Sequence, residues 1–90
     1  MIRRDLEIIN KLGLHARAAS KLVDLTGRYS ARISLGRPEQ KASDAKSIMA
    51  MLMLAANKGT RLQMECEGED EQQLADAVSA LVANRFDEDE

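Results

Sequence analysis

One short segment of the chain combines residue types that can do chemistry, namely Gly13-Leu14-His15-Ala16-Arg17. His15 is the only histidine, and an imidazole is nucleophilic near neutral pH because it titrates in that range. Arg17 adds a permanent cation whose fork of donors matches the oxygens of a phosphate group. Gly13 permits a tight turn and a close approach. The segment therefore predicts a site that accepts a phosphoryl group and releases it to another imidazole.

The element that must position His15 is a helix that begins directly after it. Residues 16–26 carry apolar side chains on one side and charged side chains on the other, which predicts an amphipathic helix that Gly27 ends. If His15 is the N-cap, its side chain and that of Arg17 can converge on the helix end, where unpaired amides favour an anion. The alternative is that His15 only caps the helix and Arg17 is solvated.

The other elements give the order βαββαβα. Residues 2–8, 31–35 and 60–67 alternate apolar and polar side chains, as half-buried strands do. A turn at 36–39 and a short polar strand near 40–43 are expected between the second strand and the second helix. The order predicts one domain over residues 1–90, an α+β fold whose small sheet is covered by helices on its apolar face.

The second helix is predicted to begin after Ser47, and Gly59 is predicted to end the helical segment. The helix is apolar on every side. Such a helix is either fully buried or part of an interface, and a chain of 90 residues has little room to surround it. Met49 and Met53 lie nearly opposite the face of Met51. We expect these two side chains to be exposed as a docking patch, the alternative being an ordinary core helix.

Composition limits the class of protein. The net charge is −2 with one Tyr and one Phe, which disfavours a nucleic-acid binder. One Cys and one His exclude a disulfide within the chain and a Cys or His cluster for zinc, so we expect no metal or cofactor. Cys66 is expected to be an inert core residue. No apolar run reaches the roughly 20 residues of a membrane helix, and no secretion signal is visible, so a cytoplasmic protein without membrane contact is expected.

Charge is unevenly distributed along the chain. Residues 1–64 hold 12 Lys and Arg against 5 Asp and Glu, whereas residues 65–90 hold 1 against 10. This pattern indicates either a solvated acidic helix and tail or a basic surface that faces an acidic partner. No acidic residue can be assigned from the sequence as the group that orients His15, and no glycine-rich nucleotide loop is present.

Four segments resemble a known family in residue type and spacing: 13–17, 46–49, 58–59 and 68–71. The family is HPr, the histidine phosphocarrier proteins of the bacterial phosphotransferase system, and the resemblance covers nearly the whole chain. Within it, residues 10–13, 50–54 and 86–89 are most similar to the nitrogen-branch subgroup, NPr. The resemblance implies an open-faced β-sandwich in which three helices cover one face of a four-stranded antiparallel sheet.

The resemblance also implies a function. His15 would accept phosphate on Nδ1 from an enzyme I-type protein and pass it to an enzyme IIA-type protein, as a monomeric carrier that cycles and is not an enzyme. Arg17 would stabilise the phosphate together with backbone amides at Ala16 and Arg17. Ser47 occupies the position that a regulatory kinase phosphorylates in some members. The implied binding surface is Ala16, Ser20, Lys21, Ser47, Ile48, Met49 and Met53.

One residue departs from the family pattern, because Ala18 stands where the family usually has Pro. Pro would fix φ in the first helical turn, whereas Ala18 restores an amide that can join the phosphate site at some cost in stiffness. Two other functions remain open. One is a sugar-branch HPr phosphocarrier, and the other is a non-catalytic regulatory binding module that acts through Met49 and Met53.

Overall fold

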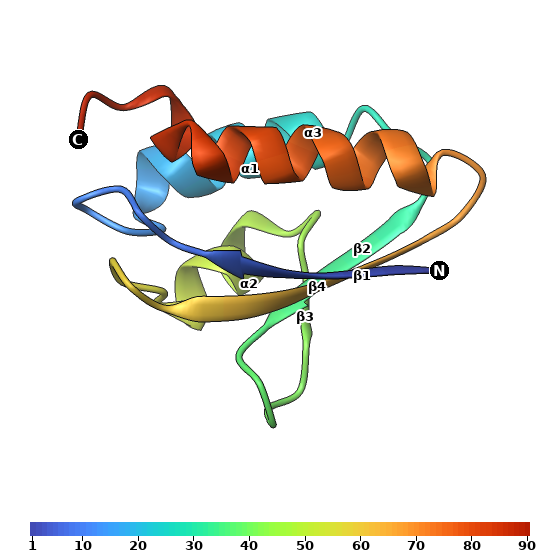
Figure 1. Cartoon of the computed structure of the whole chain (residues 1–90), viewed down its shortest axis with the longest axis horizontal. Coiled ribbons are helices and arrows are strands. Elements are labelled where there is room, and N and C mark those ends of the chain that lie inside the picture. The colour runs from blue at the N-terminus through green and yellow to red at the C-terminus, as the bar shows by residue number, and fades with distance from the viewer.

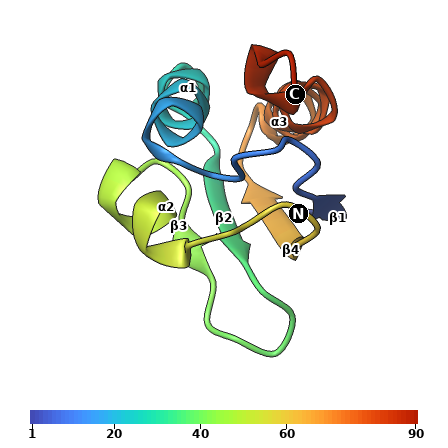
Figure 2. The same cartoon turned by 90° about the vertical axis from the view of Figure 1, so that its left-hand side faces the viewer.

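The computed structural model describes all 90 residues as four strands, three α-helices and one 3₁₀ helix (Figure 1). In chain order they are β1 (Ile2–Glu7), α1 (Ala16–Thr26), β2 (Arg32–Gly36), β3 (Ser43–Asp44), α2 (Ile48–Leu54), β4 (Arg61–Glu67), α3 (Glu71–Ala83) and η1 (Arg85–Asp87). The strands form one antiparallel sheet in the order β1-β4-β2-β3. Figure 2 shows the helices on one side of the sheet, so the predicted α+β architecture and element order are confirmed.

The sheet is held to the helices by an alternation that is clearest in β4. Leu62, Met64 and Cys66 are buried, while the residues between them point to the open face. β4 pairs with β1 and β2, where Leu6 lies opposite Leu62 and Leu35 opposite Met64. The buried residues among these belong, with side chains from the inner faces of the helices, to one cluster of 19 buried apolar residues, and Leu6 packs against this cluster. Burial raises the pKa of the Cys66 thiol, which agrees with an inert core position.

α1 has the predicted bounds, and Gly27 follows its last residue as the sequence predicts. Gly27 is the C-cap with φ −66°, a right-handed conformation that any residue adopts, and its amide donates to the carbonyl of Val23. On the inner side, Ala18, Ala19 and Leu22 are fully buried. The helix is therefore fixed by its apolar face and by the residue at its beginning.

α2 and β3 differ from the predicted boundaries. α2 ends at Leu54, well before Gly59, because Ala55 adopts a left-handed conformation with φ 51° and Ala56 turns inward, where it is 2% exposed. β3 contains only two residues, Ser43 and Asp44, so it overlaps the expected segment 40–43 only at the end of that segment. The turn before it is confirmed, since the Gln40 amide donates to the Arg37 carbonyl across Pro38.

The C-terminal residues fold back onto the molecule instead of forming only a solvated acidic tail. Phe86 in η1 is fully buried, and the Lys21 Nζ donates to its carbonyl at 3.2 Å. The amide of Lys11 donates to the Glu90 carbonyl at 2.6 Å. These contacts bring the tail to the beginning of α1.

None of the helices, of which α3 is the longest at 13 residues, has the length and hydropathy needed to cross a bilayer.

Asp70 joins the beginning of α3 to the chain before β2. Its carboxylate accepts the amides of Ser30 at 2.9 Å and Ala31 at 2.8 Å. The hydrogen bond from Ser30, followed by that from Ala31, holds the pKa of Asp70 below its ordinary value. A carboxyl group whose pKa is lower in the folded chain stabilises the fold above its unfolded pKa, and this stabilisation is lost as the pH falls through the folded pKa.

We therefore predict that Asp70→Asn lowers the free energy of unfolding at pH 7, and that the difference from the original protein shrinks toward acid pH. Urea denaturation at pH 7 and at a pH below the carboxyl range measures both values. Glu69→Gln, an exposed neighbour with no hydrogen bond, is the matched control. An equal difference at both pH values would show that the Asp70 carboxylate is not the source.

Candidate functional site

His15 is the N-cap of α1, as the sequence predicts. Its backbone is extended, with φ −81° and ψ −179°, while its carbonyl accepts the amide of Ala19 at 2.8 Å and so starts the helix. Its Nδ1 accepts the amide of Arg17 at 3.3 Å. The side chain is 27% exposed, so part of it is open to solvent.

The loop before His15 is fixed against the segment that follows α2. Gly13 has φ +69°, and a Cβ built on it would lie 2.5 Å from the Ala56 carbonyl oxygen. The Leu14 amide donates to that same carbonyl at 2.8 Å. Only glycine tolerates both the conformation and the close approach. The ring of His15 is thus placed by a rigid loop on one side and by α1 on the other.

The N-terminal end of α1 offers donors to an anion. The amides of Ala16 and Ala18 have no acceptor in the structure. Arg17 is exposed, and its guanidinium has no hydrogen-bond or ion-pair partner. Free amides, the positive end of the helix dipole and an unpaired guanidinium together favour a dianionic phosphoryl group on the adjacent Nδ1.

The structure adds two residues that the sequence did not indicate, Glu88 and Asn10. One carboxylate oxygen of Glu88 is hydrogen-bonded to the Nε2 of His15, and the other accepts the Asn10 Nδ2 at 2.9 Å. The same Asn10 nitrogen donates to the Gly13 carbonyl at 2.7 Å, and Asn10 is fully buried. Partial burial raises the pKa of Glu88, but the hydrogen bonds from Asn10 and His15 outweigh it, and the pKa of Glu88 lies below its ordinary value.

Opposite charges meet around this site. A hollow of about 640 Å³ lies beside the exposed Arg17, with Lys11 and Lys21 in its wall and tail acids opposite. Lys11 pairs with Glu90 at 3.3 Å and Lys21 with Asp87 at 3.7 Å. Lys21, expected on the binding surface, is therefore already engaged with the C-terminal segment, whereas Arg17 is not.

The exposed patch expected on α2 is present. Met49 is 62% and Met53 79% exposed, while Met51 is fully buried, and Ile48 extends the patch at 40% exposure. Ser47 caps the helix as predicted, because its Oγ accepts the Ala50 amide at 3.2 Å. Ala16 and Ser20 are also exposed, near the beginning of α1. α1 and α2 lie next to each other, as Figure 2 shows.

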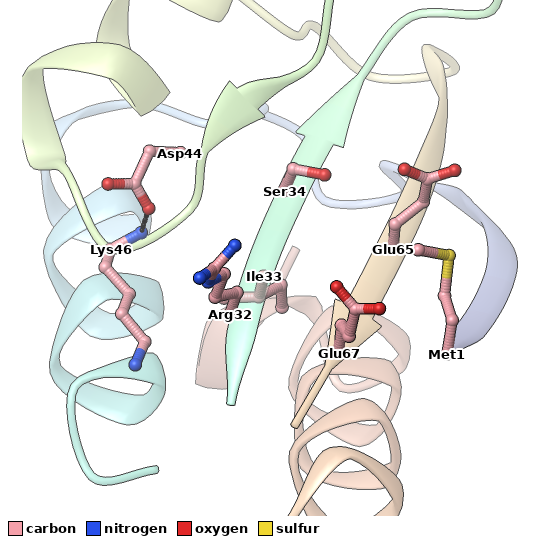
Figure 3. A pocket seen from close by; sticks show the side chains of 8 residues that line it. All are labelled: Met1, Arg32, Ile33, Ser34, Asp44, Lys46, Glu65 and Glu67. Carbon is pink, nitrogen blue, oxygen red and sulfur yellow. Dashed lines mark hydrogen bonds between the residues drawn. The ribbon is translucent and has the colours of Figure 1, made fainter. Parts of the chain in front are cut away.

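A second hollow of about 480 Å³ lies on the open face of the sheet (Figure 3). Charges of both signs surround it, from Arg32 on β2 to Glu65 and Glu67 on β4. Asp44 accepts the Lys46 amide at 2.9 Å, and the Lys46 Nζ donates to a backbone carbonyl. It contains no imidazole or thiol, and no group of three His, Cys, Asp or Glu side chains in the structure could hold a metal ion.

Comparisons with known proteins agree with this geometry. The family model described as the PTS HPr component phosphorylation site matches residues 2–84. A phosphocarrier protein HPr from Pseudomonas aeruginosa is 52% identical over 86 residues, 96% of each chain. A phosphocarrier protein NPr from Escherichia coli is 40% identical over 88 residues, 98% of each chain. A crystal structure of HPr from Thermoanaerobacter tengcongensis matches with a TM-score of 0.94 at 33% identity and covers the whole of both chains.

Proposed function

We propose, starting from the fact that the chain belongs to the HPr family of phosphocarrier proteins, that His15 carries the phosphoryl group on its Nδ1. The donor is an enzyme I-type protein, and the acceptor is a histidine of an enzyme IIA-type protein. The carrier is a cytoplasmic monomer that cycles between the two as a protein substrate, not as an enzyme. The observation that supports this most strongly is the placement of Nδ1 beside the free donors of α1.

Transfer follows from the donors around Nδ1. Its lone pair attacks phosphorus while the bond between phosphorus and the donor's histidine nitrogen breaks, so no proton has to move. The Arg17 amide stops donating to Nδ1 and donates to a phosphate oxygen instead. The Ala16 amide and the Arg17 guanidinium donate to the other phosphate oxygens. Catalysis then consists of alignment and electrostatic support, as is usual for phosphoryl transfer.

Transfer of the phosphoryl group from His15 to the acceptor protein uses the same groups. The phosphorylated ring presents phosphorus to the acceptor histidine at the open edge of the site, and the Arg17 amide can return to Nδ1 when the group leaves. The Arg17 amide donates either to Nδ1, as the helix cap, or to the phosphate. When the phosphoryl group leaves, the hydrogen bond to Nδ1 therefore partly offsets the loss of the hydrogen bond to the phosphate. The carrier therefore binds the group firmly enough to hold it and loosely enough to release it.

Docking is assigned to the exposed patch on α2 and the beginning of α1. Met49→Asp places a charge where an apolar contact is expected, so we predict that the KM for the enzyme I-type donor rises about tenfold, equivalent to roughly 1.4 kcal/mol, with little change in kcat. Gln73→Asp adds the same charge on an exposed part of α3 and is the matched control.

A Met49→Asp protein with the KM of the Gln73→Asp control would exclude this face as the docking surface. Partner binding that is lost in Met49→Asp but unchanged in His15→Ala would favour the regulatory binding module over the carrier.

Phosphorylation of Ser47 by a regulatory kinase is a separate proposal, supported by the position of Ser47 beside Ile48 in the same patch.

The branch of the phosphotransferase system is also a proposal. We assign the nitrogen branch from the segments 10–13, 50–54 and 86–89, whereas overall identity is higher to the HPr of Pseudomonas aeruginosa than to NPr. The test compares nitrogen-branch and sugar-branch enzyme I-type proteins with phosphoenolpyruvate, by intact mass over time. Faster phosphorylation by the nitrogen-branch donor is expected, and the reverse order would assign the sugar branch.

A further inference from the structure

We infer that Glu88 is a positioning residue for His15, because its carboxylate keeps the ring proton on Nε2 and leaves Nδ1 free to attack phosphorus. The inference rests on the proposed function and deepens it, since it names the group that orients the phosphoryl acceptor. Sequence alone supplied no such acid for His15. The contact joins residues 73 positions apart in the chain.

The hydrogen bonds of the His15 ring determine its tautomer. A neutral imidazole has one nitrogen that donates and one that accepts. Nδ1 faces the Arg17 amide, which can only donate, and Nε2 faces Glu88, whose ionised carboxylate can only accept. Both neighbours therefore require the same tautomer, with the proton on Nε2. The low pKa of Glu88 keeps its carboxylate ionised at neutral pH.

Glu88 is itself held in place. Its side chain is only 14% exposed, and its second oxygen accepts from Asn10, which is fully buried between the loop and the tail. The buried Phe86 anchors the tail two residues before Glu88, and the bond from the Lys11 amide to the Glu90 carbonyl holds it two residues after. A carboxylate fixed from both sides can fix the ring that it contacts.

Glu88 also acts during the transfer itself. When Nδ1 forms its bond to phosphorus, the ring keeps the proton on Nε2 and acquires a positive charge. The Glu88 carboxylate accepts a hydrogen bond from the Nε2–H group and stabilises the positive charge as it develops, while the proton stays on Nε2. This is the logic by which a carboxylate beside a reacting imidazole holds the correct tautomer and stabilises the imidazolium.

The test is Glu88→Gln, which replaces one carboxylate oxygen by an NH₂ group. If the remaining oxygen accepts from Asn10, the NH₂ group faces Nε2 and forces the ring proton onto Nδ1, against the Arg17 amide. We expect the rate of phosphorylation to fall at least about a hundredfold. Glu88→Asp keeps an ionised carboxylate, so its rate of phosphorylation should be close to that of the original protein. Asp89→Asn removes the same charge from a neighbour that bonds neither to His15 nor to Asn10, and should match the original protein.

The tautomer is read directly from ¹H–¹⁵N NMR spectra of the ring nitrogens, recorded above about pH 8, where an ordinary imidazole is neutral. The unphosphorylated protein should show a protonated Nε2 and an unprotonated Nδ1, and Glu88→Gln should shift the proton to Nδ1. The same tautomer in both proteins, or a proton on Nδ1 in the original one, overturns the inference.

This readout needs no donor protein, so it separates the two proposals. If the original protein accepts no phosphoryl group from any enzyme I-type donor, the proposed function fails, and the NMR spectra still decide whether Glu88 sets the tautomer. If the original protein is phosphorylated and Glu88→Gln reacts at the same rate as Asp89→Asn, the proposed function stands and the role of Glu88 is refuted. Backbone amide spectra confirm that each variant is folded.

Discussion

His15→Ala should accept no phosphoryl group, whereas the original protein should gain one from an enzyme I-type donor and phosphoenolpyruvate. His15 is the only imidazole in the chain, so no other side chain can replace its Nδ1. The loss should not come from unfolding, since the change removes one helix cap, worth about 1 kcal/mol, and the hydrogen bond to Glu88, while the fully buried core is untouched. Intact-mass spectrometry at neutral pH, where phosphohistidine survives, measures the result.

Two controls make this experiment decisive. Ser47→Ala removes the corresponding cap from α2 and should still be phosphorylated in full, because it alters the helix without touching the acceptor. Brief acid treatment should remove the group from the original protein, as expected for a phosphorus–nitrogen bond. A phosphoryl group that persists on His15→Ala would place the acceptor on another residue and refute the site.

Arg17→Ala should lower the rate of phosphorylation about a hundredfold without changing stability. Removing one preoriented donor from developing negative charge has an effect of this size, and the Arg17 guanidinium has no other partner whose loss could destabilise the fold. The amide of residue 17 remains, so the helix cap on Nδ1 is retained. Single-turnover rates with a phosphorylated donor provide the measurement.

Arg28→Ala is the matched control for Arg17→Ala, because it removes the same charge from an exposed residue just beyond the other end of α1. It should be phosphorylated at the original rate. Equal rates for the two variants would mean that overall charge, and not a cation beside Nδ1, governs the reaction. Arg17→Lys should lie between Arg17→Ala and the original protein, since it keeps the charge but loses the fork of donors.

Local patterns in the sequence were sufficient for the parts of the fold that depend on local physics. The amphipathic period of α1, the alternation along β4 and the polar caps His15 and Ser47 all appear in the structure where the sequence predicts them. The exposure of Met49 and Met53 also followed, because a small domain cannot bury both sides of a helix. The exposure of these two side chains follows from the size of the domain, whereas each of the other features is decided by neighbours within a few residues.

Features that depend on distant contacts were not predictable in the same way. α2 ends at Leu54 without a glycine because Ala55 is held in a left-handed conformation, while Ala56 is buried and its carbonyl receives the Leu14 amide. No local signal marks that end, since the apolar run continues through it. Tertiary contacts overrode the glycine that the sequence offered as a stop.

The acidic tail shows the same limit at the site itself. Residues 87–90 are all acidic, so type and spacing distinguish none of them. What selects Glu88 is the buried Phe86 before it and the buried Asn10, which lies 78 positions away in the chain. The charge asymmetry therefore has a partly internal explanation, because tail acids pair with Lys11 and Lys21 around one hollow, and Glu88 pairs with His15.

Heteronuclear NMR on the phosphorylated protein with ¹⁵N-labelled histidine shows which ring nitrogen of His15 carries the phosphoryl group. A coupling between ³¹P and the Nδ1 of His15, with Nε2 free of phosphorus, is the result expected from an acceptor whose Nδ1 lies beside the donors of α1. Phosphorus coupled to Nε2, or a phosphorylated protein whose His15 nitrogens show no coupling at all, would contradict the assignment of Nδ1 as the acceptor.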